Sequence, residues 1–466
     1  MTTTKRVEAV TTTTLREPLW QRLGIPPLKG NGKFVAASSI DSLGTGLILA
    51  FTVVYFARTT PVSLAAIGAA MTAARLCALP TSMVVGPLID RFTARRTAAW
   101  GNLVSVVGYL GFLLADSVWT IGVVVFLVQV GHTTYWTSSS GLVVLASTED
   151  RRTTWFGFKM ALRNTAMGVG GALAAFAFAL GEGNALHLIV IGNAASYVLA
   201  AFLLYTWRPA QHPERQAEQA DGPGTTAQKE GPAPAEPAGV EAVASAEAAG
   251  AATATKSGTG YGAVLRDGPY VLLIGVNATM VFAQMLIKVL LAIYIVEALH
   301  MPAWIAGTLI VVNAVQVSLT QTLVAKRAER SRMTRVLMLG ALLNAAAFAL
   351  FIALYPAPDA LTYVGLFTAM VIFTFGEVLA FPAADTLSVS MAPSHIRGRY
   401  LATYQLSWTV GEVAAPALLT LLLALNDLLP MLFLMGMSLL ALPLLAALER
   451  RTKAIPKAMT KNGAEA

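Results

Sequence analysis

Apolar residues in this chain are grouped into long runs, separated by short stretches that are polar and mostly basic. A helix needs roughly 20 apolar residues to cross the hydrocarbon core of a bilayer. The runs that reach this length lie near 34–57, 62–89, 98–115, 118–147, 156–181, 185–207, 269–298, 303–325, 335–355, 361–389, 400–425 and 428–449. The pattern therefore predicts an all-α polytopic membrane protein with twelve transmembrane helices, whose backbone polar groups are satisfied inside each helix.

The composition favours the same class. Of the 466 residues, 56% are apolar and only 12% are charged, with a mean hydropathy of +0.63, whereas a soluble protein carries about 25% charged residues. The net charge of +8 could suggest a nucleic-acid partner, but short basic loops explain it better, and we expect none. The single cysteine, Cys77, excludes an internal disulfide.

The positions of the basic residues predict the topology. With the N-terminus inside, 29 of the 33 Lys and Arg residues fall in cytoplasmic loops and tails, as the positive-inside rule requires. Arg58 alone falls in an outward loop. An odd number of crossings in either half would destroy this alternation. We therefore expect six plus six helices in the plasma membrane, with both termini cytoplasmic.

The chain also divides into two related halves. Shifting the sequence by 245 places Arg152 on Arg397 and Trp155 on Tyr400, as expected for pseudo-symmetric bundles of a secondary transporter. Between the halves, the sequence is rich in Ala, Gly, Pro and Glu, which predicts a disordered tether. The predicted regions are an N-terminal tail (1–32), a first bundle (33–207), a cytoplasmic linker (208–268), a second bundle (269–449) and a C-terminal tail (450–466).

Some of the apolar segments contain ionisable residues. A charge at mid-bilayer costs at least about 2.5–3.5 kcal/mol unless it faces a partner or a watery cavity. We therefore expect the helices with charges to surround a cavity, and the third, sixth, ninth and twelfth segments, which have none, to face lipid. The embedded residues are Asp41, Arg75, Arg163, Lys288, Glu377 and Glu412.

The loop after the second segment carries a motif. Gly86, Asp90, Arg91 and Arg95 match Gly-x-x-x-Asp-Arg-x-Gly-Arg/Lys-Arg/Lys, the signature loop of the major facilitator superfamily, which this region resembles. Thr93 stands where a glycine is usual, which predicts a less tight turn. Asp90 can accept hydrogen bonds from a neighbouring helix N-terminus and pair with arginines. The four matching residues thus form a candidate cytoplasmic gating loop.

A second resemblance is partial. Gly157 and Gly170 with Gly171 match the ends of the glycine-rich motif of the drug:proton antiporter branch, but Ala166 and Met167 replace its central Gly-Pro. Glycines that let helices pack closely would leave the same trace. The resemblance implies the major facilitator fold, a monomer, a small-molecule substrate, protons and the lipid bilayer as partners, and neither a cofactor nor enzymatic activity.

Asp41 is the main candidate for coupling. In a partly dry cavity it would bind a proton near neutral pH, and the alternative is a structural ion pair with Arg75. Glu377 and Glu412 are either coupling residues or static helix contacts. Lys288 either lines the cavity or extends outward, and Arg163 is either an inner-gate residue or a base that extends towards the membrane surface. The predicted cavity lining is Tyr55, Gln129, His132, Tyr135, Trp136, Asn277, Gln284, Lys288, Asn313, Gln316, Tyr404, Gln405 and Trp408.

These features lead to one functional hypothesis and two alternatives. The sequence has no Walker loop and no metal-ligand spacing, which speaks against ATP-driven pumping and a metal site. The mixed aromatic and polar lining suits a bulky amphipathic molecule. We predict proton-coupled efflux of hydrophobic or cationic small molecules by alternating access. The alternatives are a facilitator that imports a sugar, peptide or organic acid, and a scaffold or sensor that does not transport.

Overall fold

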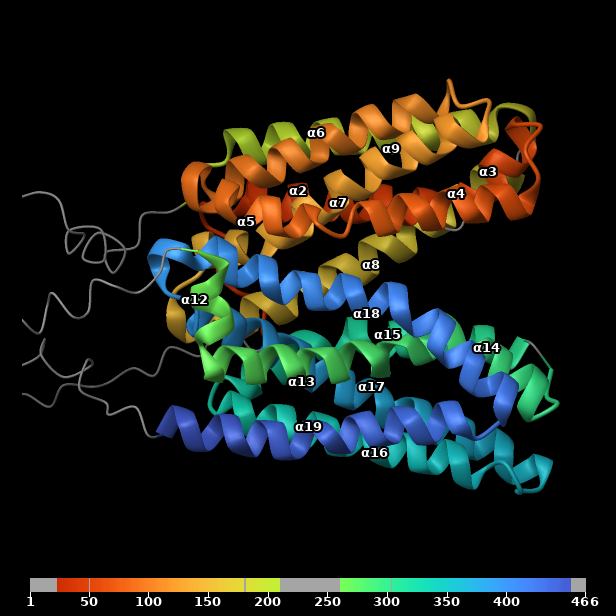
Figure 1. The fold of residues 1–466 in the computed structure, drawn as a ribbon, viewed down its shortest axis with the longest axis vertical. Helices are drawn as coiled ribbons and strands as arrows, with labels where there is room; N and C mark the ends of the chain where they lie inside the picture. The colour runs from red at the N-terminus through yellow and green to blue at the C-terminus, as the bar shows by residue number, and fades with distance from the viewer. Residues whose placement is uncertain (1–22, 50, 180–181, 210–259, 303, 454–466) are drawn as a thin grey trace, which may run out of the picture.

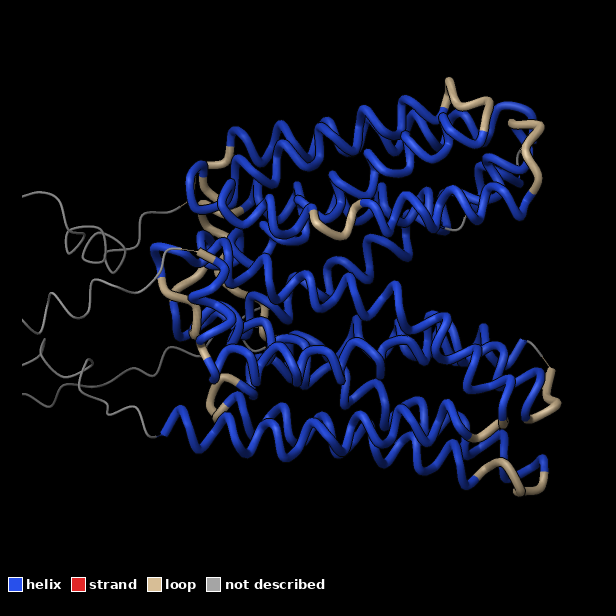
Figure 2. Tube along the Cα trace, viewed as in Figure 1, coloured by secondary structure: helices blue, strands red, loops and turns tan. Residues whose placement is uncertain are grey.

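The structure is a computed structural model, and it describes residues 23–49, 51–179, 182–209, 260–302 and 304–453. The predicted tails, 1–32 and 450–466, and the predicted linker, 208–268, lie largely outside these ranges. The described residues form helices and loops without strands (Figure 2). This agrees with the all-α prediction.

The first half contains the helices α2–α9 (Figure 1). Their bounds are α2 Gly32–Leu49, α3 Thr52–Thr59, α4 Leu64–Cys77, α5 Thr81–Phe92, α6 Ala94–Phe112, α7 Val118–Ala146, α8 Arg152–Ala179 and α9 Glu182–Thr206. The predicted second segment is broken, because α4 and α5 meet at an angle of 44°. Pro80 begins α5 and has no backbone N–H to continue the hydrogen bonds of α4.

The second half repeats this order. A short helix, α12 Tyr261–Arg266, precedes it, and the segment after it runs as α13 Gly268–Met285, two π-helical turns (Leu286–Leu290 and Tyr294–Ala298) and α14 Leu291–Ile293 between them. The remaining helices are α15 Trp304–Ala328, α16 Met333–Ala353, α17 Asp359–Ser390, α18 Arg397–Leu425 and α19 Leu429–Lys453. Eight described helices are long and apolar enough to cross a membrane, or ten with the bent pairs, and α6 and α8 run beside them. The arrangement is consistent with twelve crossings.

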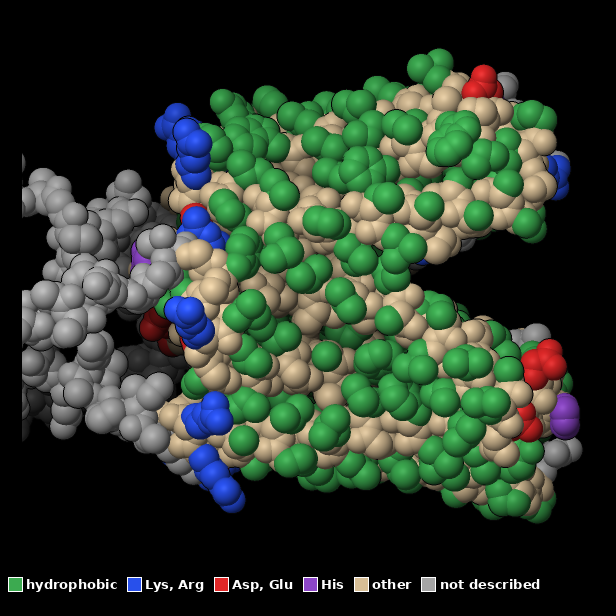
Figure 3. Space-filling model, in the orientation of Figure 1, with side chains coloured by type: hydrophobic (Ala, Val, Ile, Leu, Met, Phe, Trp, Pro, Cys, Tyr) green, Lys and Arg blue, Asp and Glu red, His purple; other side chains and the backbone are tan. Residues whose placement is uncertain are grey.

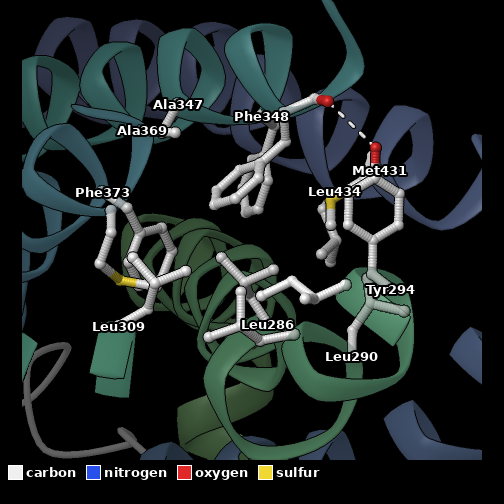
Figure 4. Packing of buried hydrophobic residues seen from close by; sticks show 14 of the residues in the cluster. Leu286, Leu290, Tyr294, Leu309, Ala347, Phe348, Ala369, Phe373, Met431 and Leu434 are labelled. Carbon is white, nitrogen blue, oxygen red and sulfur yellow. Dashed lines mark hydrogen bonds between the residues drawn. The ribbon is translucent and has the colours of Figure 1, made fainter. Parts of the chain in front are cut away.

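Equivalent contacts relate the two halves. Tyr55 donates a hydrogen bond to the carbonyl of Phe112 at 3.2 Å, and Tyr294 donates one to that of Phe351 at 3.0 Å, each across 57 residues. Both α8 and α18 begin directly after a 3₁₀ turn. Figure 4 shows this region of the second half, where Tyr294 packs in an apolar core that includes Phe348 and Phe373.

The two halves meet at one end and separate at the other (Figure 1). At the end where α2 begins and α19 ends, Val389 and Leu401 of the second half pack into a core cluster built mainly from the first half, around Phe34 and Trp155. At the opposite end, each half has an apolar cluster of its own. Figure 3 shows the cleft that opens there. We call these the closed end and the open end.

The helices without embedded charges lie on the outside. The main contacts between the halves join α5, α7 and α8 to α15, α17 and α18, all of which belong to segments other than the third, sixth, ninth and twelfth. The outer helices α6, α9, α16 and α19 expose large apolar side chains, among them Leu110, Phe202, Leu342 and Leu432. Contact with lipid chains explains such surfaces in a membrane protein.

Candidate functional site

The first part of the site is the contact between α5 and α18 at the closed end. The backbone N–H of Gly398 donates to Asp90 Oδ1 at 2.6 Å, and Arg399 pairs with Asp90 Oδ2 at 3.4 Å. A Cβ atom on Gly398 would lie only 2.3 Å from the carbonyl oxygen of Gly86. The carboxylate of one half thus caps the N-terminal turn of a helix of the other half, where the helix dipole favours a negative charge.

The two arginines of the predicted gating loop act within the first half. Arg91 is exposed and lies over the ring of Phe92 at 5.2 Å, while Arg95 donates to the carbonyl oxygens of Tyr205 (3.2 Å) and Trp207 at the end of α9. Thr93 has a φ of +79°, a conformation that favours glycine, although it replaces the glycine that is usual in the motif. The backbone here thus keeps a conformation that glycine adopts readily despite the substitution.

Two further contacts join the halves at the closed end. The N–H of Thr154, in the first turn of α8, donates to Glu329 Oε1 at 2.8 Å, and the hydroxyls of Thr153 and Thr386 lie 3.0 Å apart. Burial raises the pKa of the Glu329 carboxyl, and the hydrogen bonds from Thr154 partly oppose this shift. Both contacts would have to break for this end to open.

The short helix α12 belongs to the closed end as well, although the sequence predicted that 208–268 is a tether. Its Val264 is fully buried in the second half. Its Tyr261 donates a hydrogen bond to the carbonyl of Met83 in the first half. Burial raises the pKa of the Tyr261 phenol to about 12, which keeps the donor protonated. The last residues of the predicted linker therefore bridge the two halves.

Asp41 lies inside the first bundle. Its side chain is 3% exposed, and Oδ1 has no hydrogen-bond partner. The basic groups that act most strongly on it are Arg163 and Lys159 of α8. Arg75, the partner expected from the sequence, is exposed, and the ion pair with Asp41 is not formed. The pairing prediction failed because a neighbouring helix in sequence need not present its side chain to the same space.

Further polar residues, which the sequence did not single out, are buried in the same bundle as Asp41. Asn102 and Ser105 of α6 and Asn193 of α9 are at most 1% exposed, and their side-chain polar atoms have no hydrogen-bond partner. Thr45, one turn after Asp41, lies 3.1 Å from the hydroxyl of Tyr197. Each unsatisfied buried polar group costs about 1–3 kcal/mol. Amides within otherwise apolar segments were the available signal for this cluster.

Basic and aromatic side chains meet where α7 faces α8. The guanidinium of Arg163 lies 4.5 Å from the ring centre of Trp136, and Lys159 Nζ lies 5.1 Å from it. Lys159 also donates to Ser139. Of the two alternatives for Arg163, the inward position is the one that the structure has, and Lys159 lies beside it although it follows a short basic loop in the sequence. Cation–π attraction in a partly buried place explains their inward position.

His132 lies between these groups and the second half. Its Nε2 accepts a hydrogen bond from Trp136 Nε1 at 2.8 Å, so that nitrogen carries no proton. The charges that act on it are Glu412, Arg163, Lys288 and Arg75. Counting His132 itself, the structure therefore brings together side chains from five separate helical segments around one point of the cleft.

Lys288 and Glu412 form an ion pair across the cleft wall of the second half. Both side chains are nearly half exposed. Lys288 lies in a π-helical turn, Leu286–Leu290, a distortion that often marks functional positions. Of the two alternatives for Lys288, its ion pair with Glu412 favours a place in the cleft wall over extension towards the membrane surface.

The other carboxylates of the second half accept hydrogen bonds from their own half. Glu377 Oε2 accepts from Asn313 Nδ2 at 2.9 Å and is 9% exposed. Asp385 Oδ1 accepts from the hydroxyl of Tyr404 at 3.3 Å. Each of these carboxylates already has a donor in this conformation.

The remaining cavity candidates divide by exposure. Four side chains are half-buried, namely Gln129, Gln284, Gln405 and Trp408. Tyr135 is buried. Asn277 donates a hydrogen bond to the hydroxyl of Ser407 at 2.7 Å, and Gln316 donates one to the carbonyl of Val371 at 3.1 Å, both within the second half. Tyr55 was wrongly placed in the lining, since it is 1% exposed within an apolar cluster. In the described ranges, no three His, Cys, Asp or Glu side chains gather as a metal site requires.

Comparison with known proteins supports the fold. A family model described as Major Facilitator Superfamily matches residues 34–416 and 272–463. A search of curated protein sequences finds no match. Among solved structures, a bacterial homologue of the iron transporter ferroportin in an outward-facing state has a TM-score of 0.67 at 14% identity, covering 91% of this chain and 100% of that one.

Two further solved structures are similar at the same level. The human organic anion transporter MFSD10 (TETRAN) has a TM-score of 0.61 at 12% identity, covering 92% of this chain and 100% of that one. The proton:xylose symporter XylE, bound to 6-bromo-6-deoxy-D-glucose, has a TM-score of 0.66 at 15% identity, covering 89% and 94%. At such identities the likeness concerns the fold alone.

Proposed function

The chain belongs to the major facilitator superfamily, and from this premise we propose that it is a proton-coupled exporter of amphipathic small molecules that works by alternating access. The family membership supports a secondary transporter, and export and proton coupling are our inference. The observation that carries the proposal is Asp41, a carboxylate that is 3% exposed with Oδ1 unpartnered.

Burial of a charge without a partner costs several kcal/mol, and a bound proton removes this cost. Arg163 and Lys159 are the nearest sources of compensating charge, and both are held by Trp136 rather than by Asp41. When the cleft closes, water leaves it, and an ionised Asp41 becomes more costly. Protonated Asp41 carries no charge, so protonation favours the closed-cleft conformations. A proton taken up from the open side would thereby drive the return towards the inward-facing state.

The orientation of the chain in the membrane follows from the positions of the basic residues. Lys and Arg side chains gather at the closed end of the molecule (Figure 3). By the positive-inside rule we assign the closed end to the cytoplasm, which makes the described conformation outward-facing in the plasma membrane. The chain acts as a monomer in this proposal, because each half finds its partner surface in the other half.

The substrate preference changes in one respect from the sequence expectation. A hydrophobic body still fits the half-buried aromatic residues around the cleft. A cationic head group is less favoured, because Glu377, Asp385 and Glu412 already have donors.

The test is a growth-resistance screen of toxic organic compounds in an efflux-deficient bacterial host. Cells with the intact chain should survive higher concentrations of at least one compound, and Asp41→Asn should abolish this resistance. Asp116→Asn, at an exposed carboxylate of the loop before α7, is the matched control and should retain resistance. Equal resistance from Asp41→Asn and the intact chain would remove Asp41 from the mechanism. Increased sensitivity to a compound in cells with the intact chain would indicate import, and unchanged sensitivity to every compound would favour the scaffold.

A further inference from the structure

The two walls of the cleft differ in charge. The first half contributes basic side chains to the region around the cleft, because Arg75 and Arg163 act on His132 and Lys159 lies over the same Trp136 ring as Arg163. Its own embedded carboxylate, Asp41, is buried inside the bundle. The second half contributes the three carboxylates described above and one base, Lys288. The charge that reaches the cleft from the first half is therefore positive.

The carboxylates of the second half already accept hydrogen bonds or an ion pair, whereas the bases of the first half have N–H groups that can still donate. Within the described residues, none of the three bases of the first half has a carboxylate at ion-pairing distance. Arg163 has five N–H donors in a rigid fork, and its guanidinium lies over the ring of Trp136 and beside the sulfur of Met160 at 3.9 Å. A guanidinium in this situation is suited to bind a planar anion through two parallel hydrogen bonds.

The bases are fixed in position before any ligand arrives. Trp136 lies close to both Arg163 and Lys159, and its own indole N–H is fixed by His132. Groups that are already ordered lose less freedom when a ligand binds, which raises affinity. On the facing wall, Trp408 is half-buried and packs against Phe381 at 5.5 Å between ring centres. An anionic head and an apolar ring would thus each find a partner.

We propose that the cleft binds an amphipathic organic anion, whose carboxylate or sulfonate group accepts hydrogen bonds from Arg163 and Lys159 while its apolar body contacts the aromatic side chains of the cleft. The inference specifies the substrate class of the proposed exporter and rests on that function for its biological meaning. The binding itself requires neither a proton gradient nor Asp41.

The test compares two probes with one fluorophore and opposite charge. Dansylglycine carries a carboxylate and dansylcadaverine an ammonium group, and the dansyl fluorescence of each is titrated with the purified full-length chain in nanodiscs at fixed pH. We expect dansylglycine to bind at least about tenfold more tightly. Hydrogen bonds to charged groups contribute about 1.5–3 kcal/mol, so Arg163→Gln should weaken dansylglycine binding by roughly 10- to 100-fold.

Matched variants make the outcome decisive. Arg330→Gln, at an exposed base between α15 and α16, should leave the affinity unchanged. Lys159→Gln should weaken dansylglycine binding as well, which provides a second reading if Arg163→Gln does not fold. Tighter binding of dansylcadaverine, no binding of dansylglycine, or unchanged affinity in both variants would overturn the inference. Asp41→Asn should still bind dansylglycine, so proton-coupled export that persists in this variant would contradict the proposed function alone and leave the binding inference standing.

Discussion

Thr93 is the residue whose conformation and identity disagree most clearly. Its φ of +79° and ψ of 147° lie in a region that glycine occupies readily and other residues avoid. The contacts around it explain why the conformation persists, because the turn must place Asp90 against α18 while α6 starts directly after Thr93. The strain is thus maintained by the gating contact on one side and the helix on the other.

Replacing Thr93 should therefore stabilise the protein only if the new residue is glycine. We expect Thr93→Gly to increase the free energy of unfolding by about 1 kcal/mol, the usual cost of a left-handed conformation for a residue with a Cβ atom. Thr93→Ala keeps the Cβ atom and should give no such gain. Denaturant unfolding in detergent measures both. Equal stability of the glycine and alanine variants would contradict the strain.

The embedded charges were predictable one by one, but their partners were not. Asp41, Glu377 and Glu412 stand out because a charge in an apolar run is costly wherever it occurs. Their neighbours depend on which helices touch, and sequence adjacency misled us for Arg75. Asn102 and Asn193 escaped notice because a neutral amide disturbs hydropathy far less than a charge does. The pairing of Lys288 with Glu412 joins residues 124 positions apart, which no local pattern reveals.

Among the elements, α5 and α18 approach each other closely across the two halves. Gly86 and Gly398 face each other there, and the carboxylate of Asp90 lies within 2.6 Å of where a Cβ on Gly398 would be. Close approach of helices through small residues is common in membrane proteins. The break between α4 and α5 at Pro80 gives α5 a direction of its own, which hydropathy alone, a continuous apolar run, did not predict.

A methyl group at this approach should loosen the closed end. We expect Gly398→Ala to raise the rate at which a maleimide modifies a cysteine placed at Thr386, by about tenfold or more, because the added Cβ would lie 2.3 Å from the carbonyl of Gly86. The background is Cys77→Ala, since Cys77 is the single native cysteine and is exposed. Gly168→Ala adds the same group where nothing lies within 4 Å and should leave the rate unchanged. Equal rates in the two variants would show that the approach does not hold the closed end together.

At the scale of the whole molecule, the division into two bundles followed from periodicity, loop charge and the internal repeat. These signals act over the whole chain and average out local errors. The tilt of the halves could not follow from them, because a transporter must hold at least two arrangements of the same elements close in free energy. The shared core around Phe34 at one end and the separate clusters at the other describe one of these arrangements.

We infer that the proton on Asp41 sets the balance between these arrangements. The decisive measurement is the distance between spin labels at Trp119 and Leu361, two exposed positions at the open ends of α7 and α17. It is made in nanodiscs across pH with Cys77 replaced by Ala. We expect a long distance to dominate at alkaline pH, a shorter one to gain population on acidification, and Asp41→Asn to show the shorter distance at every pH. A pH response in Asp41→Asn identical to that of the unmodified residue would contradict the claim.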